Sequence, residues 1–105
     1  MASTVARFRP GQLIHHKLFD YRGVVVDVDP VFQGTGEWYE RMAGSHPPKD
    51  APWYHVLVHE AEHTTYVAER NLEADHSMKP IRHRLLGAHF DRFERGAYVP
   101  RRITN

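Results

Sequence analysis

The five residues from His59 to His63 match the H-E-x-x-H pattern of zinc peptidases letter for letter. That chemistry requires two histidines one helical turn apart, both facing a zinc ion, with the glutamate as general base. The residues on both flanks are aromatic and β-branched and alternate as they do in strands. Because a hairpin turn does not make the two histidines converge, the sequence favours a turn here over a zinc peptidase.

Histidine is frequent, with nine in 105 residues, whereas cysteine is absent. The absence of cysteine excludes disulfides and thiolate metal sites. The histidines could be ordinary hydrogen-bonded imidazoles, or they could make the protein sensitive to pH between about 5 and 8. A remote alternative is a surface zinc or nickel site. The expectation is that no metal or cofactor is bound, and the candidate ligands for the remote alternative are His55, His59 and His63.

No other pattern in the sequence indicates catalysis. There is no Gly-rich phosphate loop and no G-x-S-x-G nucleophile motif. Asp27 and Asp29 resemble a carboxylate pair, but outward aspartates that discourage pairing at a sheet edge explain them better. The sequence therefore predicts a binding protein and not an enzyme.

Charge is unevenly distributed, although the net charge is only +1. Residues 23–78 contain three basic and ten acidic side chains, whereas residues 79–105 contain seven basic and two acidic ones. A basic tail indicates an anionic partner, self-association or simple solvation. The candidate DNA contacts are the basic residues Lys17, Arg22, Arg82, Arg84, Arg101 and Arg102, with Trp53 and Tyr54 as candidate stacking groups.

A strand over residues 22–30 must position these groups, because three β-branched valines in a row favour a pleated surface over a helix. Alternation predicts a core face of Val24, Val26 and Val28 and an outer face of Val25, Asp27 and Asp29. The best partner strand is residues 52–58, with its apolar face formed by Tyr54, Val56 and Val58.

The remaining elements follow from turn signals and periodicity. Residues 13–17 and 64–68 are predicted strands, and residues 69–77 a loop. The long connection 31–51 should contain one helical turn at residues 38–42. Its Trp38-Tyr39 pair is either an exposed contact surface or, as the sequence favours, part of a lid that folds back over the core. Apolar residues recur at helical spacing from Leu85 to Phe93, with Gly96 at the C-cap position, so a short helix is expected there before an extended tail.

The predicted fold class is mainly β: a small SH3-like antiparallel barrel with one short C-terminal helix. Residues 1–9 are expected to form a flexible arm, and residues 10–105 a single domain. No apolar run is long enough to span a membrane and no secretory signal is apparent, which is compatible with a soluble cytoplasmic protein.

Three blocks of the sequence carry a family resemblance: YRGVVVDVDP at residues 21–30, APWYHV at residues 51–56 and TYVAE at residues 65–69. In order and spacing they resemble the HspQ/YccV-like hemimethylated DNA-binding family, a family of heat shock proteins. The resemblance covers residues 8–105 when the tail from Phe90 to Arg102 is included. The connection 31–51 and the turn 59–63 are its least family-like parts.

The resemblance implies an SH3-like barrel without enzymatic activity that binds hemimethylated DNA. It also implies a role in heat stress, in which the protein helps a cytoplasmic protease such as Lon to degrade certain proteins. The alternative is mainly a DNA-binding regulator of replication-initiator levels. Self-association is expected, as a trimer first and a dimer second, with the tail from Gly96 onward near the interface.

Overall fold

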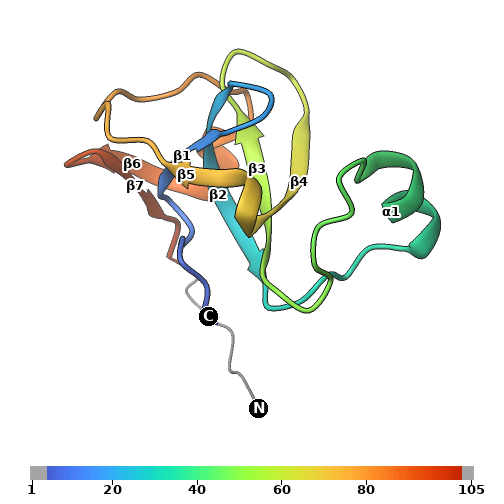
Figure 1. Ribbon diagram of the computed structural model, residues 1–105. Coiled ribbons are helices and arrows are strands. Elements are labelled where there is room, and N and C mark those ends of the chain that lie inside the picture. Colours follow the sequence, from blue (N-terminus) through green and yellow to red (C-terminus); the bar gives the residue numbers. More distant parts are fainter. Residues whose placement is uncertain (1–4, 103–105) are drawn as a thin grey trace.

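The computed structural model describes residues 5–102, and within them seven strands form two antiparallel sheets (Figure 1). The larger sheet has the strand order β4-β3-β2-β1-β5, and the smaller sheet is the β6–β7 hairpin. The elements in chain order are β1 (Leu13–His16), β2 (Arg22–Asp29), α1 (Gly36–Met42), β3 (Trp53–Val58), β4 (Thr64–Ala68), η1 (Glu69–Asn71), β5 (Leu72–Ala74), α2 (Leu86–His89), β6 (Phe90–Glu94) and β7 (Ala97–Pro100).

The mainly β, antiparallel class is confirmed, but the described residues form no closed barrel. Strands β4 and β5 remain the two edges of the larger sheet, so the SH3-like barrel is not confirmed. The three-residue 3₁₀ helix η1 alone joins these two edges along the chain. The sheet must therefore bend strongly to bring the end of β4 close to the start of β5. Strand β5 itself lies where a loop was predicted, and its first residue, Leu72, is fully buried.

Strand β2 lies at the centre of the larger sheet, and both of its faces are covered. Val25 packs in one cluster with Ile14, Tyr54 and Val56, whereas Val24 packs in a second cluster on the other face. The second face is covered by Ile81, Phe90 and Tyr98, which arrive from the C-terminal part of the chain. The prediction that Val25 faces outward is therefore wrong, because alternation assigns faces but cannot show that a later segment covers the second one.

A β-bulge between Val25 and Asp27 also shifts the pairing of β2 with β3. After a bulge the alternation of side chains changes phase. Val26 therefore packs against the cluster of Val24, whereas Val28 packs against that of Val25. Both are only half-buried, so the predicted core face shared by Val24, Val26 and Val28 is wrong. Tyr54, Val56 and Val58 on β3 are buried as predicted, and so is Phe90.

The connection between β2 and β3 folds back through the helix α1, which packs on Trp53 and Ala68 in a third cluster beside the core clusters of the sheet and does not cover them as a lid. Thr35 caps the helix, because its hydroxyl accepts a hydrogen bond from the Trp38 backbone N–H at 3.0 Å. Tyr39 is buried and donates its hydroxyl proton to the Pro47 carbonyl at 2.6 Å. The Trp38 ring packs edge-to-face on Trp53 at a centroid separation of 6.0 Å.

The short helix predicted from the apolar spacing between Leu85 and Phe93, with a C-cap at Gly96, is wrong for most of its length. Helix α2 spans only Leu86–His89, and the chain then forms the β6–β7 hairpin. Arg95 and Gly96 have φ values of 54° and 78°, which suit a tight two-residue hairpin turn. Gly96 thus serves a turn and not a helix C-cap. None of the helices in the described part of the chain is long and apolar enough to cross a membrane.

Candidate functional site

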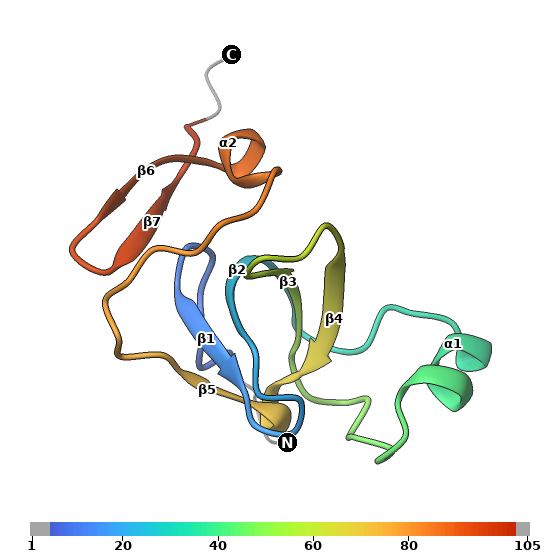
Figure 2. The ribbon, with the colours of Figure 1, turned by 90° about the horizontal axis from the view of Figure 1, so that it is seen from above.

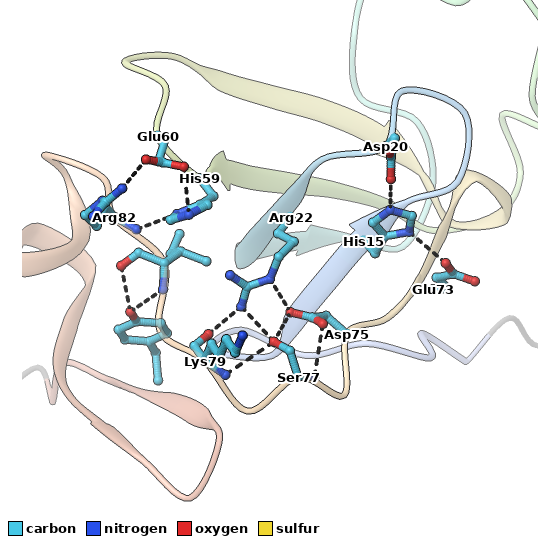
Figure 3. Close-up of polar contacts among 12 residues, drawn as sticks. His15, Asp20, Arg22, His59, Glu60, Glu73, Asp75, Ser77, Lys79 and Arg82 are labelled. Carbon is cyan, nitrogen blue, oxygen red and sulfur yellow. Dashed lines mark hydrogen bonds and ion pairs between the residues drawn. The ribbon is translucent and has the colours of Figure 1, made fainter.

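Arg22 fastens the segment after β5 to the sheet (Figure 3). Its Nε donates to the Asp75 carboxylate at 2.7 Å, and its Nη2 donates to the Ser77 hydroxyl at 3.0 Å and to the Lys79 carbonyl. Burial opposes ionisation of Asp75, but the hydrogen bonds from Arg22 and Ser77 outweigh it and lower the Asp75 pKa. Three of the five N–H donors of the Arg22 guanidinium are thus used within the chain, and its contact with DNA stays a prediction.

The turn between β3 and β4 contacts the segment after β5 at a second point, Arg82. The Arg82 backbone N–H donates to His59 Nδ1 at 2.8 Å, and the Arg82 guanidinium pairs with the Glu60 carboxylate (Figure 3). The hydrogen bond from Arg82 lowers the Glu60 pKa. Glu60 has a φ of 60°, so the H-E-x-x-H letters lie at a turn, as predicted. Arg82, although predicted to contact DNA, is paired here.

The three histidines considered as metal ligands do not come together. His59 contacts Arg82, and the carbonyl of His63 accepts a hydrogen bond from His83 Nε2 at 3.0 Å. Within residues 5–102, the one group of three possible ligands that lies close together is Asp27, Asp29 and His55.

Asp29 in that group is already bonded within the sheet. Its Oδ2 accepts hydrogen bonds from His55 Nε2 at 3.0 Å and from the Tyr66 hydroxyl at 2.7 Å. Burial, together with this hydrogen bond to Asp29, raises the Tyr66 pKa to about 12. The cluster thus joins β2, β3 and β4, and we assign no metal to it.

Trp53 and Tyr54 cannot stack on bases, because they are 2% and 0% exposed. The Trp53 indole N–H donates to the Pro48 carbonyl at 3.0 Å. The Tyr54 hydroxyl donates to Glu69 and accepts from the backbone N–H of Phe8 at 3.2 Å. Phe8, within the segment expected to be a flexible arm, is itself buried against the Tyr54 ring.

The other basic candidates fall into two places. Lys17 lies on the β1–β2 connection, whereas Gly11, which accepts a hydrogen bond from the Tyr98 backbone N–H, comes just before β1. Figure 2 shows the β1–β2 connection and the β6–β7 hairpin near opposite ends of β1. The arginines of the C-terminal part lie on and around the hairpin. Lys17 therefore does not share one surface with the hairpin arginines.

We call residues 79–102 the basic C-terminal segment. Arg92 pairs with Glu94 at 2.7 Å, and Arg101 lies 3.8 Å from Asp91. In the described residues, four exposed basic side chains of this segment form no ion pair: Lys79, Arg84, Arg95 and Arg102. A two-stranded β-ribbon is of a size that the DNA major groove admits, and the β6–β7 hairpin is such a ribbon with Arg95 at its tip.

A groove of about 490 Å³ beside β4 was not predicted from the sequence. All five residues of β4 line it, together with residues of the β1–β2 connection and of α1. None of its lining residues is Lys, Arg, Asp or Glu. The sequence signal that could have indicated it is Leu18-Phe19, an apolar pair in a short connection between two strands, where polar residues are usual. We call this feature the β4 groove.

In a comparison with known protein families, the family model described as hemimethylated DNA-binding protein YccV like matches residues 6–97. The matched range includes the larger sheet, α1, β6 and the first residue of β7, and with them most of the basic C-terminal segment.

Proposed function

The chain belongs to the YccV-like family of hemimethylated DNA-binding proteins, and from this we propose that it is a non-enzymatic protein that binds hemimethylated DNA through its basic C-terminal segment. The family match is the observation on which the proposal depends. Two features support the choice of segment: the ribbon shape of the β6–β7 hairpin and the exposed basic side chains on and around it.

Phosphate contacts would supply most of the affinity, because each neutralised phosphate releases bound counterions. Four basic side chains of the segment are free of ion pairs in the described residues. Four contacts correspond to a slope of roughly −3 to −4 when the logarithm of the binding constant is plotted against that of the salt concentration. The arginines already paired with acidic neighbours would contribute less, since a DNA contact must first break an internal pair.

An anisotropy titration with hemimethylated, fully methylated and unmethylated duplexes tests this function. We expect the hemimethylated duplex to bind several-fold more tightly than the others, with the salt dependence given above. Arg84→Gln and Arg95→Gln should each reduce the slope by about 1. Lys49→Gln is the control, because Lys49 is also exposed and forms no ion pair in the described residues but lies in the connection between α1 and β3. Equal, weak binding to all three duplexes would reject DNA recognition as the main function.

A second candidate function is regulated proteolysis in the cytoplasm. In it, the protein acts under heat stress and helps a Lon-type protease to degrade certain proteins. The apolar, uncharged β4 groove favours this candidate, because such a surface suits a polypeptide and not a phosphate backbone. A degradation assay with purified Lon-type protease and casein tests it, and an unchanged degradation rate would count against it. The alternative, a DNA-binding regulator of replication-initiator levels, would leave that rate unchanged.

We also propose that the protein self-associates, preferably as a trimer and otherwise as a dimer. The complementary charges of residues 23–78 and 79–105 support it. The prediction that the tail from Gly96 onward lies near the interface needs correction, because Tyr98 is buried in its own chain. Its hydroxyl accepts a hydrogen bond from the Ile81 backbone N–H and donates one to the Ile81 carbonyl. The Arg101 backbone N–H also donates to the His89 carbonyl at 2.9 Å, so we assign the intermolecular contact to the tail from Arg102 onward.

A further inference from the structure

Strand β4 is an open edge of the larger sheet. In residues 5–102 it pairs with β3 alone, in a register from Trp53↔Ala68 to Leu57↔Thr64. In an antiparallel edge strand, alternate residues direct their backbone N–H and C=O groups away from the sheet. Proteins usually protect such edges with charges, prolines or bulges, yet the sequence of β4 is TTYVA and its pairing is regular. The unprotected edge opens directly into the β4 groove.

Two apolar walls flank this edge, one on each face of the sheet. The wall from the β1–β2 connection contains Phe19, which is 75% exposed, and the wall from α1 contains Met42, which is 63% exposed. Exposed large apolar side chains that gather in one groove indicate an interaction site.

Successive residues of β4 face opposite walls. The Thr65 hydroxyl bonds to the Tyr21 hydroxyl of the first wall at 2.8 Å, whereas the Tyr66 ring packs on Trp38 of the second at 5.7 Å. A strand added beside β4 would have the same alternation, so its side chains would meet the two walls in turn. The groove therefore offers both components of strand addition: backbone partners along one side and apolar contacts above and below.

The charge of the groove restricts its occupant. Its lining contains no Lys, Arg, Asp or Glu, and the lining side chains that could carry a positive charge are His16, His55 and His63. A phosphate backbone would find no lysine or arginine there, and a charged peptide would lose hydration without gaining a partner. An uncharged, extended and apolar segment matches both the backbone edge and the walls.

We propose that the β4 groove binds an extended, uncharged segment of another polypeptide, which pairs with β4 as an additional strand. This inference deepens the second candidate function, since such segments are exposed in proteins that have lost their native fold. It is independent of DNA binding, because the basic C-terminal segment contributes no residue to the groove.

The first test uses a fluorescein-labelled, capped heptapeptide in which valine alternates with threonine. We expect saturable binding by anisotropy. A second peptide of identical sequence, N-methylated at alternate residues, keeps the side chains but cannot form the strand pairing. It should bind at least tenfold more weakly. Equal affinity for the two peptides would overturn strand addition.

The second test uses substitutions in the two walls. Phe19→Ser and Met42→Ser remove exposed apolar contacts, and each should weaken peptide binding about tenfold. Val5→Ser is the matched control, because Val5 is 76% exposed but lies outside the groove. Unchanged peptide affinity in both wall variants would overturn the proposal. All three variants should retain the DNA affinity of the unsubstituted protein.

The same variants separate the other outcomes. If the groove joins two copies of this chain, Phe19→Ser should reduce the mass measured by light scattering and the peptide should not bind the intact protein. That result would overturn the proposal in favour of a self-interface. If the peptide does not bind but the protein still accelerates Lon-type degradation, the groove assignment fails while the second candidate function stands.

Discussion

At the scale of single residues, two adjacent histidines on β1 have opposite electrostatic environments. Hydrogen bonds to Asp20 at 2.6 Å and Glu73 at 2.7 Å raise the His15 pKa. Burial lowers the pKa of His16. His16 Nδ1 accepts hydrogen bonds from the backbone N–H groups of Leu18 and Phe19 at 3.1 and 3.0 Å, so the neutral ring shapes one wall of the β4 groove.

The two histidines should therefore affect stability in opposite pH windows. The unfolded-state pKa of histidine is about 6.5. The stabilising contribution of His15 is complete below that value and is lost as the pH rises through the raised folded-state pKa. The contribution of His16 is complete above it and is lost as the pH falls through the lowered folded-state pKa, because protonation of Nδ1 removes its acceptor. NMR titration should give a midpoint above 6.5 for His15 and below 6.5 for His16; a common midpoint would contradict this assignment.

A pair of neighbouring valines tests the double coverage of β2. Val25 is fully buried and Val26 only half-buried. Val25→Ala should lower the free energy of unfolding by about 1–3 kcal/mol, through lost burial and a residual cavity. Val26→Ala should cost less. Urea unfolding measures the free energy of unfolding of both variants, provided that the m-value does not change. A larger loss for Val26→Ala than for Val25→Ala would support the one-sided strand predicted from alternation.

At the scale of elements, the sequence predicted the strands that alternate and missed those that do not. Strands β2, β3 and β4 lie within two residues of their predicted bounds. Runs of β-branched residues between turn residues rarely form any secondary structure other than a strand. Strand β5 has three residues, too few for periodicity to show. At the C-terminus, Leu86, Phe90 and Phe93 fit helical spacing, yet a short helix followed by a strand brings all three to the same cluster.

The candidate sites were harder to predict than the strands. Trp53 and Tyr54 have the right types for stacking, but residue type does not reveal burial. Arg22 is basic, but its acidic partner Asp75 lies more than fifty residues away in the sequence. The β4 groove combines three segments that only the folded chain brings together. In each case a long-range contact decides the role of the residue.

The turn of the β6–β7 hairpin requires a glycine at position 96. The φ of Gly96 is 78°, and an added Cβ would lie 2.3 Å from the Met78 sulfur. Gly96→Ala should therefore destabilise the protein by about 1–2 kcal/mol. Gly87→Ala is the matched control, since Gly87 lies in helix α2 with no heavy atom within 4 Å of an added Cβ, and it should be neutral or stabilising. Thermal unfolding of both variants measures the difference, and equal melting temperatures would argue against the turn geometry.

At the scale of the whole molecule, the C-terminal tail should contribute to assembly. We expect light scattering of the intact protein at tens of micromolar to give a trimer or, failing that, a dimer. A version that ends at Arg101 keeps the contacts of Tyr98 with Ile81 and the hydrogen bonds of Arg101 to His89 and Gly87, so it should fold. Loss of residues 102–105 should then lower the oligomer mass. A monomeric intact protein would defeat this prediction, and an unchanged oligomer after truncation would exclude the tail from the interface.

The contact between the first and last strands also determines when the protein can fold during its synthesis. The Tyr98 backbone N–H donates to the Gly11 carbonyl at 2.8 Å, and Gly11 in turn donates to the Val25 carbonyl at 2.8 Å. Tyr98 also belongs to the cluster that covers the second face of β2. During synthesis, Leu13, Val24 and Leu57 therefore stay uncovered until Ile81, Phe90 and Tyr98 have left the ribosomal exit tunnel. The sheet cannot complete its folding before Tyr98 emerges, and until then the nascent chain presents an apolar sheet face to chaperones.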